Sequence, residues 1–124
     1  MANNPTQLQE LTERVLAFRD ERNWKQFHSP KNLAMGLSIE AAELQELFLW
    51  KTPEEVADFL KSESGQTRAA EEIADIFIYL LYLAQACEVD LPEALIHKLA
   101  HNAEKYPVEK SYGSARKYNE LTES

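Results

Sequence analysis

Apolar residues recur every three or four positions along most of the chain, which is the period of an amphipathic helix. No segment alternates apolar and polar residues with the period of two that a half-buried strand would show. The pattern therefore predicts an all-α fold with four main helices and one short helix. These helices are expected at about residues 7–22, 32–50, 53–61, 67–87 and 91–105.

Three segments carry the signature of a helix N-terminus. Thr6 is a capping residue ahead of the first apolar stripe. Thr52-Pro53-Glu54-Glu55 and Asp90-Leu91-Pro92-Glu93 each combine a cap, a proline in the first turn and an acid that can complete a capping box. Ser29 precedes a proline, which disfavours helical backbone, so we expect a loop over residues 24–31.

The remaining segments are expected to be irregular. Residues 62–65, Ser-Glu-Ser-Gly, are interpreted as a connector between two helices. Tyr106 and Pro107 should stop the last main helix, and the polar residues 108–124 predict an extended tail with room for a short turn. Residues 1–124 together are expected to form a single domain, because 124 residues is an ordinary domain length.

The long helix predicted over residues 67–87 is apolar on more than one face. Its apolar residues are Ile73, Ile76, Phe77, Ile78, Leu80, Leu81 and Leu83. A helix that is apolar all round is usually buried on all sides. In so small a domain a neighbouring subunit would have to cover part of it, so we predict a homo-oligomer. Cys87, the single cysteine, ends this apolar stretch and is predicted to be buried.

The charge and the hydropathy exclude some classes of protein. The formal net charge is −8, which argues against a surface for duplex DNA or RNA, because that surface needs clustered lysine and arginine. A nucleotide ligand remains open, since a bound divalent cation supplies positive charge. The N-terminal residues 1–6 lack a basic region, and the longest apolar run, about 76–84, is far shorter than the ~18 residues of a membrane span. We therefore expect a cytoplasmic protein.

Two pairs of acids are the main chemical feature of the sequence. Glu40 and Glu43 lie three residues apart on one predicted helix, and Glu72 and Asp75 lie three apart on another. Residues at this spacing face the same side of a helix. Four carboxylates beside apolar stripes are a good donor set for a hard cation such as Mg²⁺. Spacing alone leaves the alternative of two solvated acidic faces, which is the commoner arrangement for charged residues.

Other constellations are less specific. His97 and His101 have a spacing that suits zinc, but no cysteine or clear third ligand accompanies them, so surface or packing roles are favoured. Trp24 and Trp50 flank the first acidic helix and could stack on a base, although the residues alone favour ordinary core and subunit contacts. No glycine-rich phosphate-binding loop occurs.

The residues around the acidic pairs resemble the MazG-like all-α nucleoside triphosphate pyrophosphohydrolases. The two matching motifs are Ile39-Glu40-Ala41-Ala42-Glu43-Leu44 and Glu71-Glu72-Ile73-Ala74-Asp75-Ile76. Further phrases resemble the branch of this family that acts on dCTP: residues 24–28, 30–33, 48–52, 89–92, Lys98, Asn102, 106–107 and 116–118. The likeness extends over roughly residues 11–121.

The resemblance implies a helical bundle assembled as a tetramer, with Mg²⁺-dependent hydrolysis between the α and β phosphates of a nucleoside triphosphate. It implies that Glu40, Glu43, Glu72 and Asp75 hold Mg²⁺ and form the catalytic set together with Lys98. The residues implied in substrate binding are Trp24, His28, Trp50, Tyr79, Lys98 and Asn102.

Two positions depart from the family pattern. Ile39 stands where the wider family often has another glutamate, but the dCTP branch also lacks this acid, so we expect metal binding to be retained. Val15 stands where some relatives have a histidine on the first helix, which leaves the preferred base open. The alternatives are hydrolysis of dUTP, dATP, a modified cytosine nucleotide or phosphoribosyl-ATP, and a non-catalytic helical oligomer that binds nucleotide.

Overall fold

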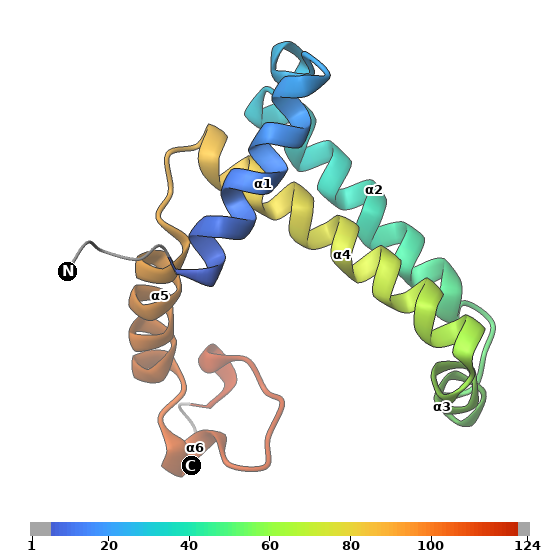
Figure 1. The fold of residues 1–124 in the computed structure, drawn as a ribbon. Coiled ribbons are helices and arrows are strands. Elements are labelled where there is room, and N and C mark those ends of the chain that lie inside the picture. The colour runs from blue at the N-terminus through green and yellow to red at the C-terminus, as the bar shows by residue number, and fades with distance from the viewer. Residues whose placement is uncertain (1–5, 122–124) are drawn as a thin grey trace. The chain divides into compact units, whose positions relative to one another are not determined.

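The computed structural model describes residues 6–121, and every regular element within that range is helical (Figure 1). The elements are α1 (Gln7–Glu21), η1 (Lys25–Phe27), α2 (Pro30–Phe48), α3 (Pro53–Lys61), α4 (Glu63–Ala86), α5 (Leu91–Lys105), α6 (Val108–Ser111) and η2 (Tyr118–Glu120). The all-α prediction is confirmed. The chain divides into two compact units, one ending at Glu88 and the other beginning at Val89. The predictions of a single domain and of a four-helix bundle stay predictions.

Three helices of the first unit pack against α4. Figure 1 shows α2 and α4 side by side and antiparallel, with α3 at the bend that joins them. α1 packs against the other end of α4. α4 is therefore the central element of this unit, and the acids of α2 and α4 lie on adjacent helices.

The three predicted N-caps, Thr6, Thr52 and Asp90, are confirmed, and their hydrogen bonds explain them. The hydroxyls of Thr6 and Thr52 accept from the backbone N–H groups three residues on, and both residues form complete capping boxes. Asp90 caps α5 in the same way through Glu93 N–H. Ser29 caps α2, so this helix begins at Pro30 and not near residue 32.

The predicted connector at residues 62–65 is wrong. Ser62 is both the last residue of the α3 cap and the N-cap of α4, because its backbone N–H donates to Asp58 and Phe59 carbonyls while its hydroxyl accepts from Gly65 N–H. Helix α4 consequently begins at Glu63. Gly65 is buried against the Phe59 carbonyl, and this contact leaves no room for a side chain.

The prediction that Cys87 is buried is also wrong. Cys87 is exposed, because α4 ends at Ala86 and the cysteine lies in the C-cap beyond the packed turns. The following residue, Glu88, has a φ of 57°, in the left-handed region. The chain therefore leaves the helical direction directly after Cys87.

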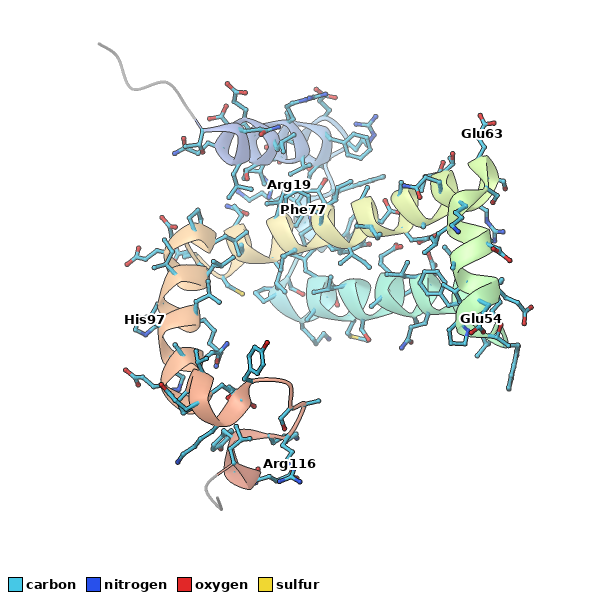
Figure 2. All side chains as sticks on the ribbon, turned by 90° about the horizontal axis from the view of Figure 1, so that it is seen from below. Arg19, Glu54, Glu63, Phe77, His97 and Arg116 are labelled. Atoms are coloured by element: carbon cyan, nitrogen blue, oxygen red, sulfur yellow. The ribbon has the colours of Figure 1, made fainter. Side chains whose placement is uncertain are left out.

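Two polar interactions join α1 to α4. The Tyr82 hydroxyl donates to the Val15 carbonyl over 2.9 Å, and Tyr82 itself is only 5% exposed. Arg19 is equally buried, and its guanidinium donates to Asp20 at 2.8 Å and to Gln85 at 3.2 Å. Figure 2 shows Arg19 and Phe77 in the space between the two helices. These contacts satisfy buried donors and fix the register of α1 on α4.

Many apolar side chains remain exposed on a single chain. On α2 and α4 these are Met35, Ile39, Ile73, Phe77 and Leu80. Contact with a second subunit could bury these side chains, as expected for an oligomer, and the oligomer stays a prediction. None of the helices between residues 6 and 121 has the length and hydropathy to cross a bilayer.

The second unit consists of α5 and the segment that follows it. The tail is more ordered than predicted, since it contains the short helices α6 and η2. Tyr118 of η2 meets Tyr106 edge to face, with ring centroids 6.2 Å apart, and Lys105 Nζ lies 4.6 Å from the centroid of the Tyr118 ring. Leu121 is buried. These contacts hold the end of the described chain on the C-terminus of α5.

Candidate functional site

Three carboxylates converge between α2 and α4. One oxygen from each of Glu40, Glu43 and Glu72 lies within 4.8 Å of one oxygen from each of the other two. The spacing of three residues places Glu40 and Glu43 on the same side of α2, and the packing of α4 against α2 brings Glu72 to them. We call these three residues the carboxylate cluster. Opposite ligands of one Mg²⁺ ion are about 4.2 Å apart, so small side-chain movements would suit the cluster to one ion.

Two oxygens of the carboxylate cluster are buried without a partner. Glu40 Oε2 and Glu72 Oε2 have no hydrogen-bond partner in the described chain. A buried carboxylate oxygen without a donor is costly. Oxygen ligands of this kind are what a hard divalent cation prefers, so the donor set fits Mg²⁺.

The electrostatics of the cluster also favour a cation. The pKa of Glu40 is raised to about 7, first by burial and then by a side-chain hydrogen bond with Glu43 and the charges of Glu43, Asp75 and Glu72. Burial and the neighbouring carboxylates raise the pKa of Glu72 as well. Every charged neighbour that shifts these two pKa values is itself an acid. A cation in the cluster would remove this repulsion.

Asp75 is the fourth acid of the predicted quartet. It is exposed, and it does not belong to the group of oxygens within 4.8 Å of one another. Its charge still contributes to the raised pKa values of Glu40 and Glu72. The structure therefore brings three of the four predicted ligands together and places Asp75 at the edge of the cluster.

Two of the predicted substrate-binding residues meet Tyr82. The ring of Tyr79 meets the ring of Tyr82 edge to face, with centroids 6.5 Å apart. The His28 ring lies 4.8 Å from that of Tyr82, and its Nδ1 is buried without a hydrogen-bond partner among the described residues. Burial, with the charge of Arg19 as a second cause, lowers the pKa of His28. His28 therefore packs against Tyr82 of α4, in surroundings that disfavour its charged form.

The two tryptophans lie in different surroundings. Trp24 is partly exposed and meets Phe18 edge to face at 5.8 Å, with the Arg22 guanidinium 3.7 Å from the centroid of the Phe18 ring. Trp50 is 91% exposed. It lies in a turn closed by a hydrogen bond from Lys51 N–H to the Phe48 carbonyl, and its φ is 65°.

A groove of about 400 Å³ runs between α1 and α4. Its walls are mainly apolar, and Arg14 is the charged residue among those that line it. The lining residues include Val15, Phe18, Ala74, Phe77, Ile78 and Tyr82. Ala74 directly precedes Asp75 in the chain, so the groove begins beside the acidic motif of α4.

Lys98 and Asn102 lie on α5, in the second unit. Lys98 is exposed and Asn102 is half-buried. Their predicted roles toward substrate stay predictions. His97 and His101 also lie on α5 and are exposed, and the one group of potential metal ligands among residues 6–121 is the carboxylate cluster.

The sequence does not single out Gly36 as a residue near the site. Tyr82 is one of several aromatic residues in the sequence, and nothing in its spacing predicts that it contacts both His28 and Tyr79. Gly36 carried a usable signal, since it is a glycine in the interior of a predicted helix, four residues before Glu40.

Comparison with known proteins places this geometry in a family. The model of the MazG-like family matches residues 36–121, a span that includes both acidic motifs. The chain belongs to the MazG-like family. Its relatives include dCTP pyrophosphatase 1 of Bos taurus, which is 43% identical over 120 residues, covering 97% of this chain and 70% of the relative.

Two further matches agree with this MazG-like assignment. The dCTP pyrophosphatase 1 of Homo sapiens is 44% identical over 104 residues, which cover 84% of this chain and 61% of the human protein. The chain thus spans only about two thirds of the length of these relatives. A crystal structure of a pyrophosphatase from Archaeoglobus fulgidus superposes with a TM-score of 0.78 at 40% identity, covering 86% of this chain and 98% of that one.

Proposed function

We propose that this chain hydrolyses dCTP, or a modified dCTP, to the monophosphate and pyrophosphate in a Mg²⁺-dependent reaction. The reaction would remove unwanted nucleotides from the cellular pool. The observation that carries the proposal is the carboxylate cluster, with its unpartnered oxygens on Glu40 and Glu72. The similar proteins are named dCTP pyrophosphatase and pyrophosphatase, and these names support pyrophosphate release as the reaction and cytosine as the base.

The residues that would hold Mg²⁺ are Glu40, Glu43, Glu72 and Asp75. When bound, the ion would supply positive charge to the phosphates and polarise the bond to be broken. A nucleoside triphosphate is strongly anionic, and the carboxylates alone would repel it. The acids of α2 and α4 therefore serve substrate binding only by attracting and placing the cation.

Within the carboxylate cluster, Glu43 differs from the other two acids in being exposed. An exposed carboxylate beside two half-buried ones can accept a hydrogen bond from a water molecule and orient it. We assign Glu43 this role toward the attacking water. Most of the rate then comes from positioning and from stabilised phosphate charge.

The aromatic residues would bind the nucleoside. Tyr79 follows Asp75 by one helical turn and presents its ring at the same α2–α4 interface. His28, Trp24 and Trp50 are proposed to complete the nucleoside pocket, because bases stack on aromatic rings at about 1–3 kcal/mol each. Lys98 and Asn102 of α5 are proposed to contact the triphosphate and the sugar, with Lys98 stabilising charge during the reaction.

A second candidate is the same reaction on another nucleotide, such as dUTP, dATP or phosphoribosyl-ATP. The observation that favours it is the apolar lining of the groove between α1 and α4, where Val15 offers no polar side-chain atom. Base discrimination by a site usually depends on hydrogen bonds to the base. An apolar wall would therefore accept more than one base.

We further propose that the chain acts as a cytoplasmic homotetramer, assembled as a dimer of dimers, and that it binds neither duplex nucleic acid nor membranes. The exposed apolar residues of α2, α4 and α5 support the assembly, because patches of this kind usually mark interfaces. The net charge of −8 supports the lack of nucleic-acid binding.

A panel of triphosphates tests the proposal. The purified chain is assayed with dCTP, 5-methyl-dCTP, dUTP and dATP, with Mg²⁺ or with EDTA, and pyrophosphate is measured separately from orthophosphate. We expect pyrophosphate only with Mg²⁺ and fastest with a cytosine nucleotide. Equal rates on all four substrates would favour the second candidate. Nucleotide binding without release of pyrophosphate would show a non-catalytic binding protein and overturn the enzymatic proposal.

A further inference from the structure

Gly36 lies in the interior of α2, and the ring of Tyr79 on α4 occupies the place of a side chain at position 36. A Cβ atom added to Gly36 would clash with Cε1 of the ring, and it would lie 2.9 Å from Cζ and 3.0 Å from Cδ1. Real Cβ atoms essentially never come closer than 3.0 Å to another atom of this kind. Backbone and ring are therefore in direct contact, with no room for a methyl group.

Local backbone geometry does not explain this glycine. Glycine is among the least favourable residues in a helix interior, because its backbone loses the most freedom on folding. Gly36 lies within the regular helix Pro30–Phe48, and Gly113 is the glycine with positive φ among the described residues. The close approach of Tyr79 is the feature that requires glycine at position 36.

The contact lies one helical turn from the carboxylate cluster on both helices. Gly36 precedes Glu40 by four residues on α2, and Tyr79 follows Asp75 by four residues on α4. Four residues of helix correspond to about 6 Å. The Tyr79 ring is therefore beside the carboxylates, at a distance that the sugar and base of a metal-bound nucleotide can reach.

A second contact restrains the Tyr79 ring. It meets the Tyr82 ring at an interplanar angle of 87°. Tyr82 is buried, and the hydrogen bond from its hydroxyl to the Val15 carbonyl ties it to α1. Because Tyr82 is fixed, the position of the Tyr79 ring depends on how closely it can approach α2.

We propose that Gly36 is a positioning residue for nucleotide recognition: it lets the Tyr79 ring lie against α2, where the ring contacts the sugar and base. The inference rests on the proposed function, since it takes the nucleotide to be bound at the carboxylates. A methyl group at position 36 displaces the ring and weakens nucleotide binding. It leaves the carboxylates one turn away, and hence the metal requirement, unchanged.

The experiment is a double-mutant cycle in the full chain, with Gly36→Ala, Tyr79→Leu and the double variant. Ser38→Ala, a change at an exposed position of the same helix, is the matched control for helix propensity. Binding of dCMP is measured by calorimetry with Mg²⁺, alongside kcat and KM for dCTP and the half-saturating Mg²⁺ concentration.

We expect Gly36→Ala to weaken dCMP binding and raise KM by roughly tenfold, the size of one lost base contact, with kcat and the Mg²⁺ requirement unchanged. Adding Gly36→Ala to Tyr79→Leu should cost nothing more, because no ring is left to displace. The inference would be overturned if Gly36→Ala bound dCMP as tightly as the wild type. It would also be overturned if adding Gly36→Ala to Tyr79→Leu weakened dCMP binding by the same factor of ten.

Two outcomes separate this inference from the proposed function. A wild-type chain that releases no pyrophosphate from any triphosphate overturns the function, while the dCMP titrations still test the role of Gly36. A wild-type chain that releases pyrophosphate but does not bind dCMP overturns the inference and leaves the function standing. If Gly36→Ala does not fold, the double variant is compared with Tyr79→Leu alone. Equal dCMP binding by these two supports the steric contact, and weaker binding by the double variant refutes it.

Discussion

One carboxylate oxygen of Glu40 lies within 4.8 Å of one of Glu72 across the α2–α4 interface, and each residue has a buried oxygen without a hydrogen-bond partner in the described chain. Like charges so placed repel each other unless a proton or a cation intervenes. The packing of α2 against α4 therefore buries two carboxylate oxygens that have no hydrogen-bond donor among residues 6–121. Neutralising one of these acids should stabilise the metal-free chain and at the same time abolish metal binding at the proposed site.

Glu72→Gln should separate these two effects. We expect the thermal midpoint in EDTA to rise, because the amide removes a charge that burial and Glu43 disfavour. Mg²⁺ should no longer raise the midpoint, and kcat for dCTP should fall by roughly 100-fold or more, since one metal ligand is lost. Glu46→Gln, at an exposed acid of α2 outside the cluster, is the matched control. A Glu72→Gln enzyme with wild-type turnover would contradict the ligand role.

The stability of the metal-free chain should decrease as the pH rises from about 4.5 to about 7. In this window the folded state keeps a proton on Glu40, whose pKa is raised to about 7, whereas the unfolded state has lost it. The folded state binds more protons, so stability falls with pH and then levels off. Thermal midpoints in EDTA from pH 5 to pH 8 measure the slope. Glu40→Gln should flatten it, and an unchanged slope in this variant would assign the effect to other groups.

Tyr82→Phe should destabilise the first unit by about 1 kcal/mol, the usual net value of a buried hydrogen bond. The change removes only the hydroxyl that donates to the Val15 carbonyl and leaves the packed ring in place. Urea denaturation gives the free energy of unfolding. Tyr112→Phe is the control, because Tyr112 is 90% exposed. Equal effects of the two substitutions would show that the α1–α4 hydrogen bond contributes no net stability.

Trp50→Gly should raise stability while weakening substrate binding. Leu49 and Trp50 form the centre of a type II turn, and its second central position has positive φ and favours glycine. Because the indole is 91% exposed in the single chain, little packing is lost. Trp50→Ala keeps the unfavourable φ, so it should raise KM for dCTP without the gain in stability. A loss of stability in Trp50→Gly would show instead that the indole is buried in the assembly.

Most helix boundaries could be predicted because the information is local. Thr6, Thr52 and Asp90 each bond to a backbone N–H three residues away, so a short stretch of sequence contains the whole interaction. Ser62 was misread because Gly65 suggests a break in isolation, whereas its N–H bonds to the Ser62 hydroxyl and starts a helix. Cys87 was misplaced because burial ends with the helix and not with the apolar run.

The candidate site was predictable only within each helix. The pairing of Glu40 with Glu43 follows from the helical period, but the approach of Glu72 depends on the register of α4 along α2. The same register brings Tyr79 onto Gly36 and leaves Asp75 at the edge of the cluster. The register between two helices is set by how their side chains pack. The pattern of apolar residues predicts which face of each helix is buried, but it does not predict how far one helix is shifted along the other.

Ser62 ends one helix and begins the next, and the Phe59 carbonyl closes the space around Gly65 two turns before Glu72. The bend between α3 and α4 therefore contains no loop residue whose backbone could change conformation without disturbing one of the two helices. Because α4 is one continuous helix from Glu63 to Ala86, we expect a change that distorts this corner to be transmitted along the helix to the acids in its middle. The first measurable effect of substitutions at this bend should thus be weaker binding of Mg²⁺ at the proposed site, although the bend is far from the carboxylates.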